Sequence, residues 1–209
     1  MMLMTFPLLL DEWADVKMRT AKLERETTEV KIRVNLNLDG EGKSKVNTGI
    51  RFFDHMLSTL AKHSYWNLEV DATGDLIHHL MEDVAIVLGE AARKALGEKL
   101  GIRRFGFSIV PMDDSLVRAA IDLGGRAYVH LELGLKGSDI EGVKVEDIEH
   151  FFLSLGEALK ANIHISLLYG KNDHHKVEAA IKALAVALRE AVRIEERVKG
   201  EKPSVKGVL

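Results

Sequence analysis

The chain has 209 residues, of which 46% are hydrophobic and 29% are charged, and its formal net charge is -3. This balance is that of a globular protein and excludes a disordered chain, and the lack of a basic surplus argues against nucleic acid as a partner. With no cysteine in the sequence, disulfides, thiolate metal sites and thiol catalysis are excluded.

The first ten residues are apolar apart from Thr5, but they contain no Lys or Arg, and the acidic residues Asp11 and Glu12 follow them. A signal peptide needs a basic start, and a membrane helix needs about 20 apolar residues. We therefore expect a cytoplasmic protein without a membrane segment. Residues 1–18 are interpreted as an N-terminal extension.

The segments after this extension alternate between predicted strands and predicted helices. Alternating apolar and polar residues predict a half-buried strand over 31–38, and helical spacing of apolar residues follows over 51–62. A strand over 67–72 and a long amphipathic helix over 78–96 come next. The same patterns predict strands over 107–110, 116–122, 127–135 and 162–167 and helices over 145–161 and 174–197.

The two halves of the chain are similar in sequence. With His55 placed over His150, an offset of 150 − 55 = 95 residues, the strand 31–38 aligns with 127–135, and the strand 67–72 aligns with 162–167. Such a duplication predicts an α+β fold of two similar halves, each a β-sheet layer covered by two helices. The halves are expected at about 19–100 and 101–197, before a tail at 198–209. The sequence has no Pro- or Ser-rich linker, so we expect one compact unit.

Histidine and glutamate recur in register in both halves, in a His-His-x-x-Glu motif at the start of the second helix. Residues three or four apart share a helix face, whereas two adjacent imidazoles point in different directions and are better suited to serving two ions. Imidazole and carboxylate without thiolate suit divalent Mn, Fe, Co, Ni or Zn. A single motif also fits helix capping, but two copies, each with a further histidine, favour metal binding. The predicted ligands are His55, His78, His79, Glu82, His150, His174, His175 and Glu178.

Several segments in order along the chain resemble the signatures of one enzyme family. Residues 48–57, TGIRFFDHML, are similar to the TGxxFxDHML signature of imidazoleglycerol-phosphate dehydratases, and residues 75–83 resemble the first HHxxED block of that family. Further similar blocks are RFG at 104–106, PMDD at 111–114, DLGGR at 122–126, HFF at 150–152, GKNDHH at 170–175 and PSVKG at 203–207.

The resemblance covers nearly the whole chain, from about residue 19 to residue 209, with some departures. The loop before His78 is shorter than usual in the family. Unusual residues stand at Val30, Thr59, Leu80 and Val205, where the family commonly has Thr, Gln, Thr and Thr. None of these departures removes a proposed ligand.

The resemblance implies a fold, a reaction and an assembly. The implied fold consists of two similar α+β halves of the ribosomal protein S5 domain 2-like type. The implied enzyme is a hydro-lyase of histidine biosynthesis, which dehydrates D-erythro-imidazoleglycerol phosphate to imidazole-acetol phosphate. Two manganese ions per active site would be held by the eight residues named above, and a metal-bound imidazolate would expel hydroxide to give a diazafulvene-like intermediate. The implied assembly is a homo-oligomeric shell of 24 subunits with sites between subunits.

The resemblance also gives roles to individual residues. It implies that Glu29 is the base, that Glu178 and Lys182 are catalytic, and that Glu29 and Lys182 contact the substrate as well. Without the resemblance, Glu29 would be interpreted as a polar residue at the start of a strand, and Lys182 as a solvent-exposed charge on a helix. The implied phosphate contacts are Arg104, Arg126, Ser204 and Lys206, and His63 is a further candidate substrate contact.

Two other functions fit the metal ligands taken by themselves. A dimetal hydrolase would use paired ions to activate water. A metal-stabilised structural shell would use the histidines only to join subunits. Formation of the ketone product from imidazoleglycerol phosphate separates the dehydratase from both alternatives.

Overall fold

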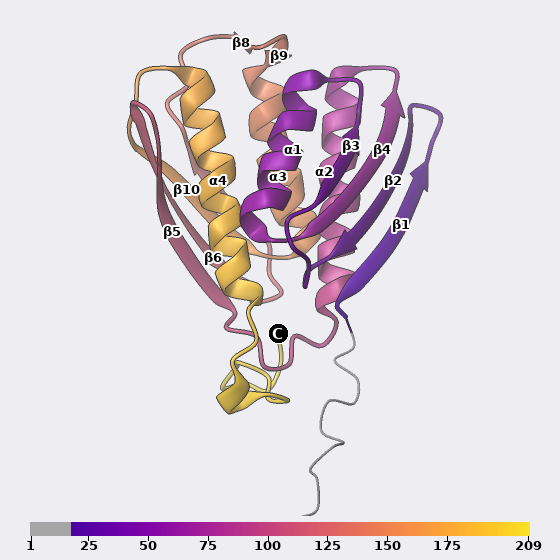
Figure 1. Cartoon of the computed structure of the whole chain (residues 1–209), viewed down its shortest axis with the longest axis vertical. Coiled ribbons are helices and arrows are strands. Elements are labelled where there is room, and N and C mark those ends of the chain that lie inside the picture. The colour runs from indigo at the N-terminus through magenta and orange to yellow at the C-terminus, as the bar shows by residue number, and fades with distance from the viewer. Residues whose placement is uncertain (1–17) are drawn as a thin grey trace, which may run out of the picture.

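The computed structural model describes residues 18–209, so the N-terminal extension expected from the sequence lies outside the described residues except for Met18. Two four-stranded sheets form the outer layers, and four helices lie between them (Figure 1). Within residues 18–209, none of the helices has the length and hydropathy needed to cross a membrane.

The first sheet has the strand order β1-β2-β4-β3. Two helices, α1 and α2, cover its inner face. The elements of this half are β1 (Thr20–Glu26), β2 (Val30–Asn37), β3 (Ser44–Asn47), α1 (Arg51–Ser64), β4 (Asn67–Gly74) and α2 (Ile77–Leu96).

The second sheet has the strand order β5-β6-β10-β7, and α3 and α4 cover its inner face. A short hairpin of β8 and β9 precedes α3, and the 3-10 helix η1 follows α4. The elements of this half are β5 (Phe105–Met112), β6 (Ser115–Asp122), β7 (Tyr128–Glu132), β8 (Asp139–Ile140), β9 (Val143–Lys144), α3 (Val145–Leu159), β10 (Asn162–Tyr169), α4 (Asp173–Val192) and η1 (Glu196–Val198).

The two sheets have the same topology, which confirms the predicted α+β duplication. In each sheet two antiparallel pairings are followed by one parallel pairing, β3 with β4 and β7 with β10. The counterpart of β2 is therefore β6, at an offset of 115 − 30 = 85, so the alignment of segment 31–38 with 127–135 was wrong. The strand β4 matches β10 at the predicted offset, 162 − 67 = 95. The offset increases because the segment between β7 and α3 is longer than the segment between β3 and α1, and the β8–β9 hairpin lies in this longer segment.

The helix predicted over 174–197 ends earlier, at Val192. Residues 193–195 are extended because they exchange backbone hydrogen bonds with the segment after α2: Arg103 N donates to Arg193 O, and Glu195 N donates to Gly101 O, both at 2.8 Å. This pairing ties the C-terminal tail to the segment that joins the two halves.

The helices of the two halves pack against each other in crossed pairs, α1 with α4 and α2 with α3. At Gly89 of α2 a Cβ atom would lie 2.7 Å from the Cβ of Ala158 in α3, so glycine permits this close approach. The inward faces supply fully buried apolar side chains, including Ile32 of β2 and Leu88 of α2, to a core that includes residues of both halves. All four helices begin at the same end of the molecule (Figure 1).

Candidate metal centre and active site

Three predicted ligands from different halves of the chain meet between α2 and α3. Glu82 Oε2 lies 3.8 Å from His78 Nε2 and 4.0 Å from His150 Nδ1, and the donor atoms of the three side chains are within 4.8 Å of one another. Metal–ligand bonds of about 2.0–2.2 Å place two ligands of one ion roughly 3–4 Å apart. These three residues, called here the α2–α3 group, therefore nearly match the spacing of ligands around one ion.

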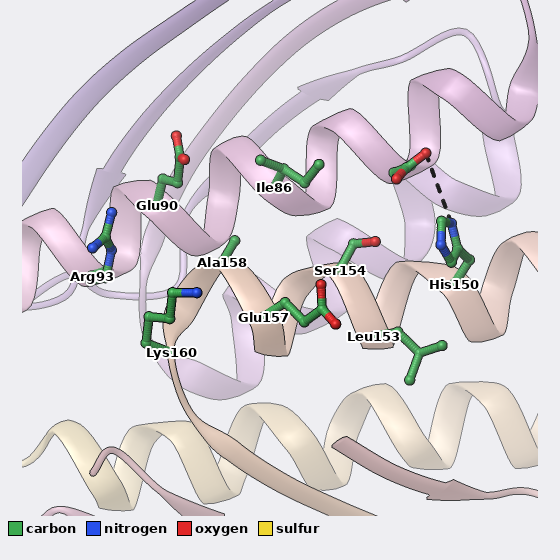
Figure 2. Close-up of a pocket in the computed structure, with 10 residues that line it drawn as sticks. Ile86, Glu90, Arg93, His150, Leu153, Ser154, Glu157, Ala158 and Lys160 are labelled. Carbon is green, nitrogen blue, oxygen red and sulfur yellow. Dashed lines mark ion pairs between the residues drawn. The ribbon is translucent and has the colours of Figure 1, made fainter. Parts of the chain in front are cut away.

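His150 provides a second indication of a ligand at this position. Its Nδ1 atom is buried and, among the described residues, has no hydrogen-bond partner. A buried polar atom normally has a partner. His150 and Glu82 both line a cavity of about 350 Å³ between α2 and α3. Figure 2 shows His150 there, with a dashed line that marks its ion pair with a carboxylate of the facing helix.

The repeat-related residues form a second group between α4 and α1, with two residues from the second half and one from the first. Glu178 Oε2 lies 3.3 Å from His174 Nε2 and 3.6 Å from His55 Nε2. These three residues are called the α4–α1 group. Lys182 Nζ lies 2.8 Å from Glu178 Oε1. Burial acts to raise the pKa of Glu178, but the hydrogen bond and charge of Lys182 outweigh it and hold the pKa below its usual value. Glu178 is therefore ionised at neutral pH.

All four histidines of the two His-His motifs have a carboxylate against Nδ1. Because a carboxylate only accepts, each Nδ1 donates its N–H to it, and in the neutral ring this leaves the lone pair on Nε2. This arrangement is typical of metal-ligating histidines. The pairs are His78 with Asp147 at 2.7 Å, His79 with Asp75 at 2.9 Å, His174 with Glu141 at 3.2 Å and His175 with Asp114 at 2.5 Å.

The sequence analysis did not identify these four carboxylates. Asp75 precedes His79 by four residues, the spacing of neighbours on a helix face, so its role had a detectable signal. The other three carboxylates are 33 to 69 residues away from their histidines in the sequence. Only the folded structure brings them together.

The structure does not bring His79 or His175 into either group. His79 Nδ1 faces Asp75 and lies 3.8 Å from Glu29 Oε2, and His175 lies beside Asp113 and Asp114. The sequence prediction that the two adjacent rings of each motif point in different directions agrees with this geometry. Each group within one chain thus has three donors, and one further histidine of each motif faces elsewhere.

The four residues expected to contact phosphate line one cavity of about 440 Å³. Arg104 directly precedes β5, Arg126 lies in the loop after β6, and Ser204 and Lys206 belong to the C-terminal tail. Asp122 accepts hydrogen bonds of 2.6 Å and 3.0 Å from Arg104, and this pairing fixes the guanidinium group. The cavity is called the tail cavity below.

Lys99 supports this cavity and was not identified from the sequence. Its side chain is buried, and Nζ donates to the carbonyl oxygen of Leu123 at 2.9 Å, directly before the Gly124–Gly125 turn that leads to Arg126. Burial lowers the pKa of Lys99, and the charge of Arg104 acts in the same direction. Lys99 therefore positions the loop that carries Arg126.

His63 lies at the end of α1, close to Lys182 and apart from the residues that line the tail cavity. Burial lowers the pKa of His63, and the positive charges of Lys182 and Arg189 lower it further. His63 is therefore neutral at physiological pH.

The fold and the two groups define a duplicated α+β enzyme whose donor atoms suit a divalent metal. The family model for imidazoleglycerol-phosphate dehydratase matches residues 48–188, and the chain belongs to this family. A relative of the same name from Methanothermobacter thermautotrophicus is 52% identical over 93% of this chain and 100% of its own length. The corresponding protein of Chloroherpeton thalassium is 50% identical over 91% of this chain and 98% of its own length.

Solved structures agree with this assignment. A crystal structure of IGPD from Pyrococcus furiosus is 41% identical, covers 90% of this chain and 100% of its own, and superposes with a TM-score of 0.78. The Staphylococcus aureus structure is 31% identical over 84% of this chain and 100% of its own, with a TM-score of 0.76. The protein is a hydro-lyase of histidine biosynthesis that dehydrates imidazoleglycerol phosphate, as expected from its motifs.

Proposed function

We propose that the dehydration uses two manganese ions, one bound by the α2–α3 group and one by the α4–α1 group. The observation that carries the proposal is the carboxylate placed against Nδ1 of each of the four histidines of the His-His motifs, which in the neutral ring leaves Nε2 available to a metal. The unpartnered Nδ1 of His150 fits the same interpretation. When bound, such an ion acts as a Lewis acid toward the imidazole ring of the substrate.

The active site is formed between subunits. The His-His-x-x-Glu motifs of both groups lie in the first turns of α2 and α4. The tail cavity is lined in part by the C-terminal tail, which follows the opposite end of α4 (Figure 1). Because α4 continues for 192 − 178 = 14 residues after Glu178, these two places are at least about 20 Å apart, too far for one small phosphorylated substrate to contact both. The tail cavity of one copy therefore serves the metal groups of another copy. His79 and His175, which face away from the groups of their own chain, supply fourth ligands to neighbouring copies.

The proposed assembly is the shell of 24 subunits implied by the sequence motifs, and the proposed location is the cytoplasm. A closed shell of identical subunits repeats one set of contacts and completes each site in the same way. Metal ligands contributed by two copies also stabilise the contact between these copies.

The residues of this chain then have distinct roles. Glu29, half exposed beside His79, takes a proton from the substrate carbon next to the one that loses hydroxide. Lys182 keeps Glu178 ionised and, with the neutral His63 nearby, contacts the substrate. The cations of the tail cavity, Arg104, Arg126 and Lys206, bind the phosphate together with Ser204.

Metal dependence is tested by removing and restoring the ions. We expect chelation to abolish formation of the ketone product from imidazoleglycerol phosphate, and Mn²⁺ to restore it. Release of inorganic phosphate in place of the ketone would indicate a hydrolase. Full activity of metal-free protein would contradict the proposed metal chemistry.

The location of the site between subunits is tested by mixing two impaired variants and assaying them at a substrate concentration well below the raised KM of the Arg126 variant. Glu29→Gln removes the proposed base beside His79, and Arg126→Ala removes a phosphate contact of the tail cavity. Both variants keep all of the proposed metal ligands. After dissociation and joint reassembly, random mixing restores about a quarter of the sites, because each site then takes its intact parts from different copies. No restored activity in mixed shells of normal size would contradict a site shared between copies.

A further inference from the structure

We propose that the two groups bind their ions with unequal affinity and that the α2–α3 group is the tighter site. The inference rests on the proposed metal function. It concerns the residues next to the ligands, which differ between the two halves although the ligands themselves correspond.

The first difference is a charge beside the glutamate ligand. Lys182 stands one turn after Glu178 and pairs with it at 2.8 Å. The corresponding position of the first half is Ile86, since 182 − 86 = 96, the same offset that separates His78 from His174. Figure 2 shows Ile86 in the cavity that also contains His150. The carboxylate of Glu178 thus shares its charge with an ammonium group, whereas Glu82 does not.

The second difference is the support of the histidine ligand. In the α2–α3 group, Asp147 of α3 contacts the ring of His78. In the α4–α1 group, Phe52 of α1 contacts the ring of His174. Asp147 and Phe52 occupy corresponding positions, because 147 − 52 = 95 is the offset that separates His55 from His150. Asp147 is 5% exposed and accepts from His78 Nδ1 at 2.7 Å. The ring of Phe52 packs against His174 instead, with centroids 5.4 Å apart.

His174 also has a carboxylate partner, but a weaker one. Glu141 lies 3.2 Å from its Nδ1 and is 60% exposed. A buried carboxylate increases the basicity of the ring that it supports, whereas water and salt screen an exposed one. Asp147 therefore strengthens His78 as a ligand more than Glu141 strengthens His174.

Both differences act in the same direction. Around the α2–α3 group two carboxylates contribute negative charge, Glu82 as a ligand and Asp147 behind the ring of His78, and within residues 18–209 Glu82 has no ion pair with Lys or Arg. Around the α4–α1 group the two carboxylates are Glu178 and Glu141, and the positive charge of Lys182 offsets the negative charge of Glu178. A divalent cation is bound more tightly where the net negative charge is larger and less exposed to water. The ion of the α4–α1 group, next to Lys182 and His63, is therefore the more easily exchanged one.

The experiment is a calorimetric titration of metal-free protein with Mn²⁺, with the bound metal counted by elemental analysis. We expect two classes of site, one ion each per chain, with affinities separated by at least about tenfold, the scale on which supporting residues change metal affinity. Ile86→Lys places an ammonium group beside Glu82 and is expected to weaken only the tighter class by about tenfold or more. Ile86→Met is the matched control, because it keeps the size of the side chain without the charge.

The reverse substitution tests the same idea if Ile86→Lys does not fold. Lys182→Met removes the cation from the α4–α1 group and is expected to tighten only the weaker class. Asp147→Asn is expected to weaken the tighter class, with Glu146→Gln, an exposed neighbour on the same helix turn, as its control.

The outcomes separate this inference from the metal function on which it rests. Protein that binds no Mn²⁺ would contradict the metal centre itself. Two ions bound with one affinity would overturn only the inequality. Two classes that respond equally to Ile86→Lys and to Ile86→Met would overturn its electrostatic cause.

Discussion

The ring of His150 lies parallel to the ring of His78, with centroids 5.0 Å apart and an angle of 10° between the ring planes. The two histidines come from α3 and α2, which belong to opposite halves of the chain. The crossed packing of the helices therefore builds each metal group from both copies of the duplicated unit. Neither half contains a complete group by itself, so the duplication and the site depend on each other.

His150→Ala is expected to remove one of the two bound ions and to abolish turnover. Its Nδ1 is one of the three donors that the described residues of one chain bring to the α2–α3 group, and the loss leaves Glu82 with a single histidine of its own chain. Bound manganese per chain is measured by elemental analysis after dialysis. His130→Ala is the control, since His130 is exposed on β7 and outside both groups. Full metal content in the His150 variant would show that this ring is not a ligand.

The candidate ligands could be found from the sequence because the same pattern of histidine and glutamate occurs twice. Two His-His-x-x-Glu motifs in register, each with a separate histidine on another helix, gave eight candidates, and the structure brings six of them together in two groups of three. The pairing of His55 with the motif of the other half was not predictable, because it depends on which helices pack together. The closeness of α2 and α3 at Gly89 and Ala158 has no signature in the spacing of the histidines.

The strand alignment failed for a related reason. Alternating apolar and polar residues occur in any half-buried strand, so segment 31–38 matched 127–135 as well as it would match its true counterpart, 115–122. The strands β1 and β3 were not predicted, since Ala21 and Leu23 in one and Val46 in the other leave too few apolar residues for a clear period. Their places are fixed by pairing with β2 and β4.

Glu29→Gln is expected to abolish turnover while metal content and assembly stay unchanged. The amide keeps the shape of the side chain but cannot accept a proton, so the loss should fall on kcat by about 100-fold or more. Single-turnover product formation and metal analysis are the measurements. Glu26→Gln is the control, because Glu26 is an exposed carboxylate of the same hairpin that pairs with Lys31. Normal turnover of the Glu29 variant would show that another group is the base.

Arg126→Ala and Lys206→Ala are each expected to raise KM for imidazoleglycerol phosphate while metal content is retained. Both cations line the tail cavity, and the loss of a charge-assisted hydrogen bond to phosphate costs about 1.5–3 kcal/mol, or roughly 10–100-fold. Steady-state kinetics measures the change. Arg118→Ala, at an exposed position of β6, is the control. An unchanged KM in both variants would argue against phosphate binding in this cavity.

The pair of Arg19 and Asp39 is expected to make part of the stability depend on pH. Arg19 Nη2 and backbone N donate to Asp39, and Arg19 Nη1 donates to Val192 O at the end of α4. Burial acts to raise the pKa of Asp39, but the hydrogen bonds and charge of Arg19 outweigh it and lower the pKa. The ionised carboxyl is therefore favoured in the folded state, so its stabilisation is present above the unfolded pKa of about 3.9 and is lost as the pH falls through the lower folded value.

Asp39→Asn should therefore destabilise the protein at pH 7 by about 1 kcal/mol, the scale of a partly exposed ion pair. The difference from the unsubstituted protein should shrink towards zero as the pH falls well below 3. Denaturant unfolding of metal-free protein at pH 7 and in acid measures this difference in stability. Metal-free protein is used because proton-linked loss of metal then makes no contribution. Asp71→Asn, an exposed position on β4, serves as the control. A destabilisation of the Asp39 variant that is equally large in acid would indicate lost packing and not the lost charge of the carboxylate.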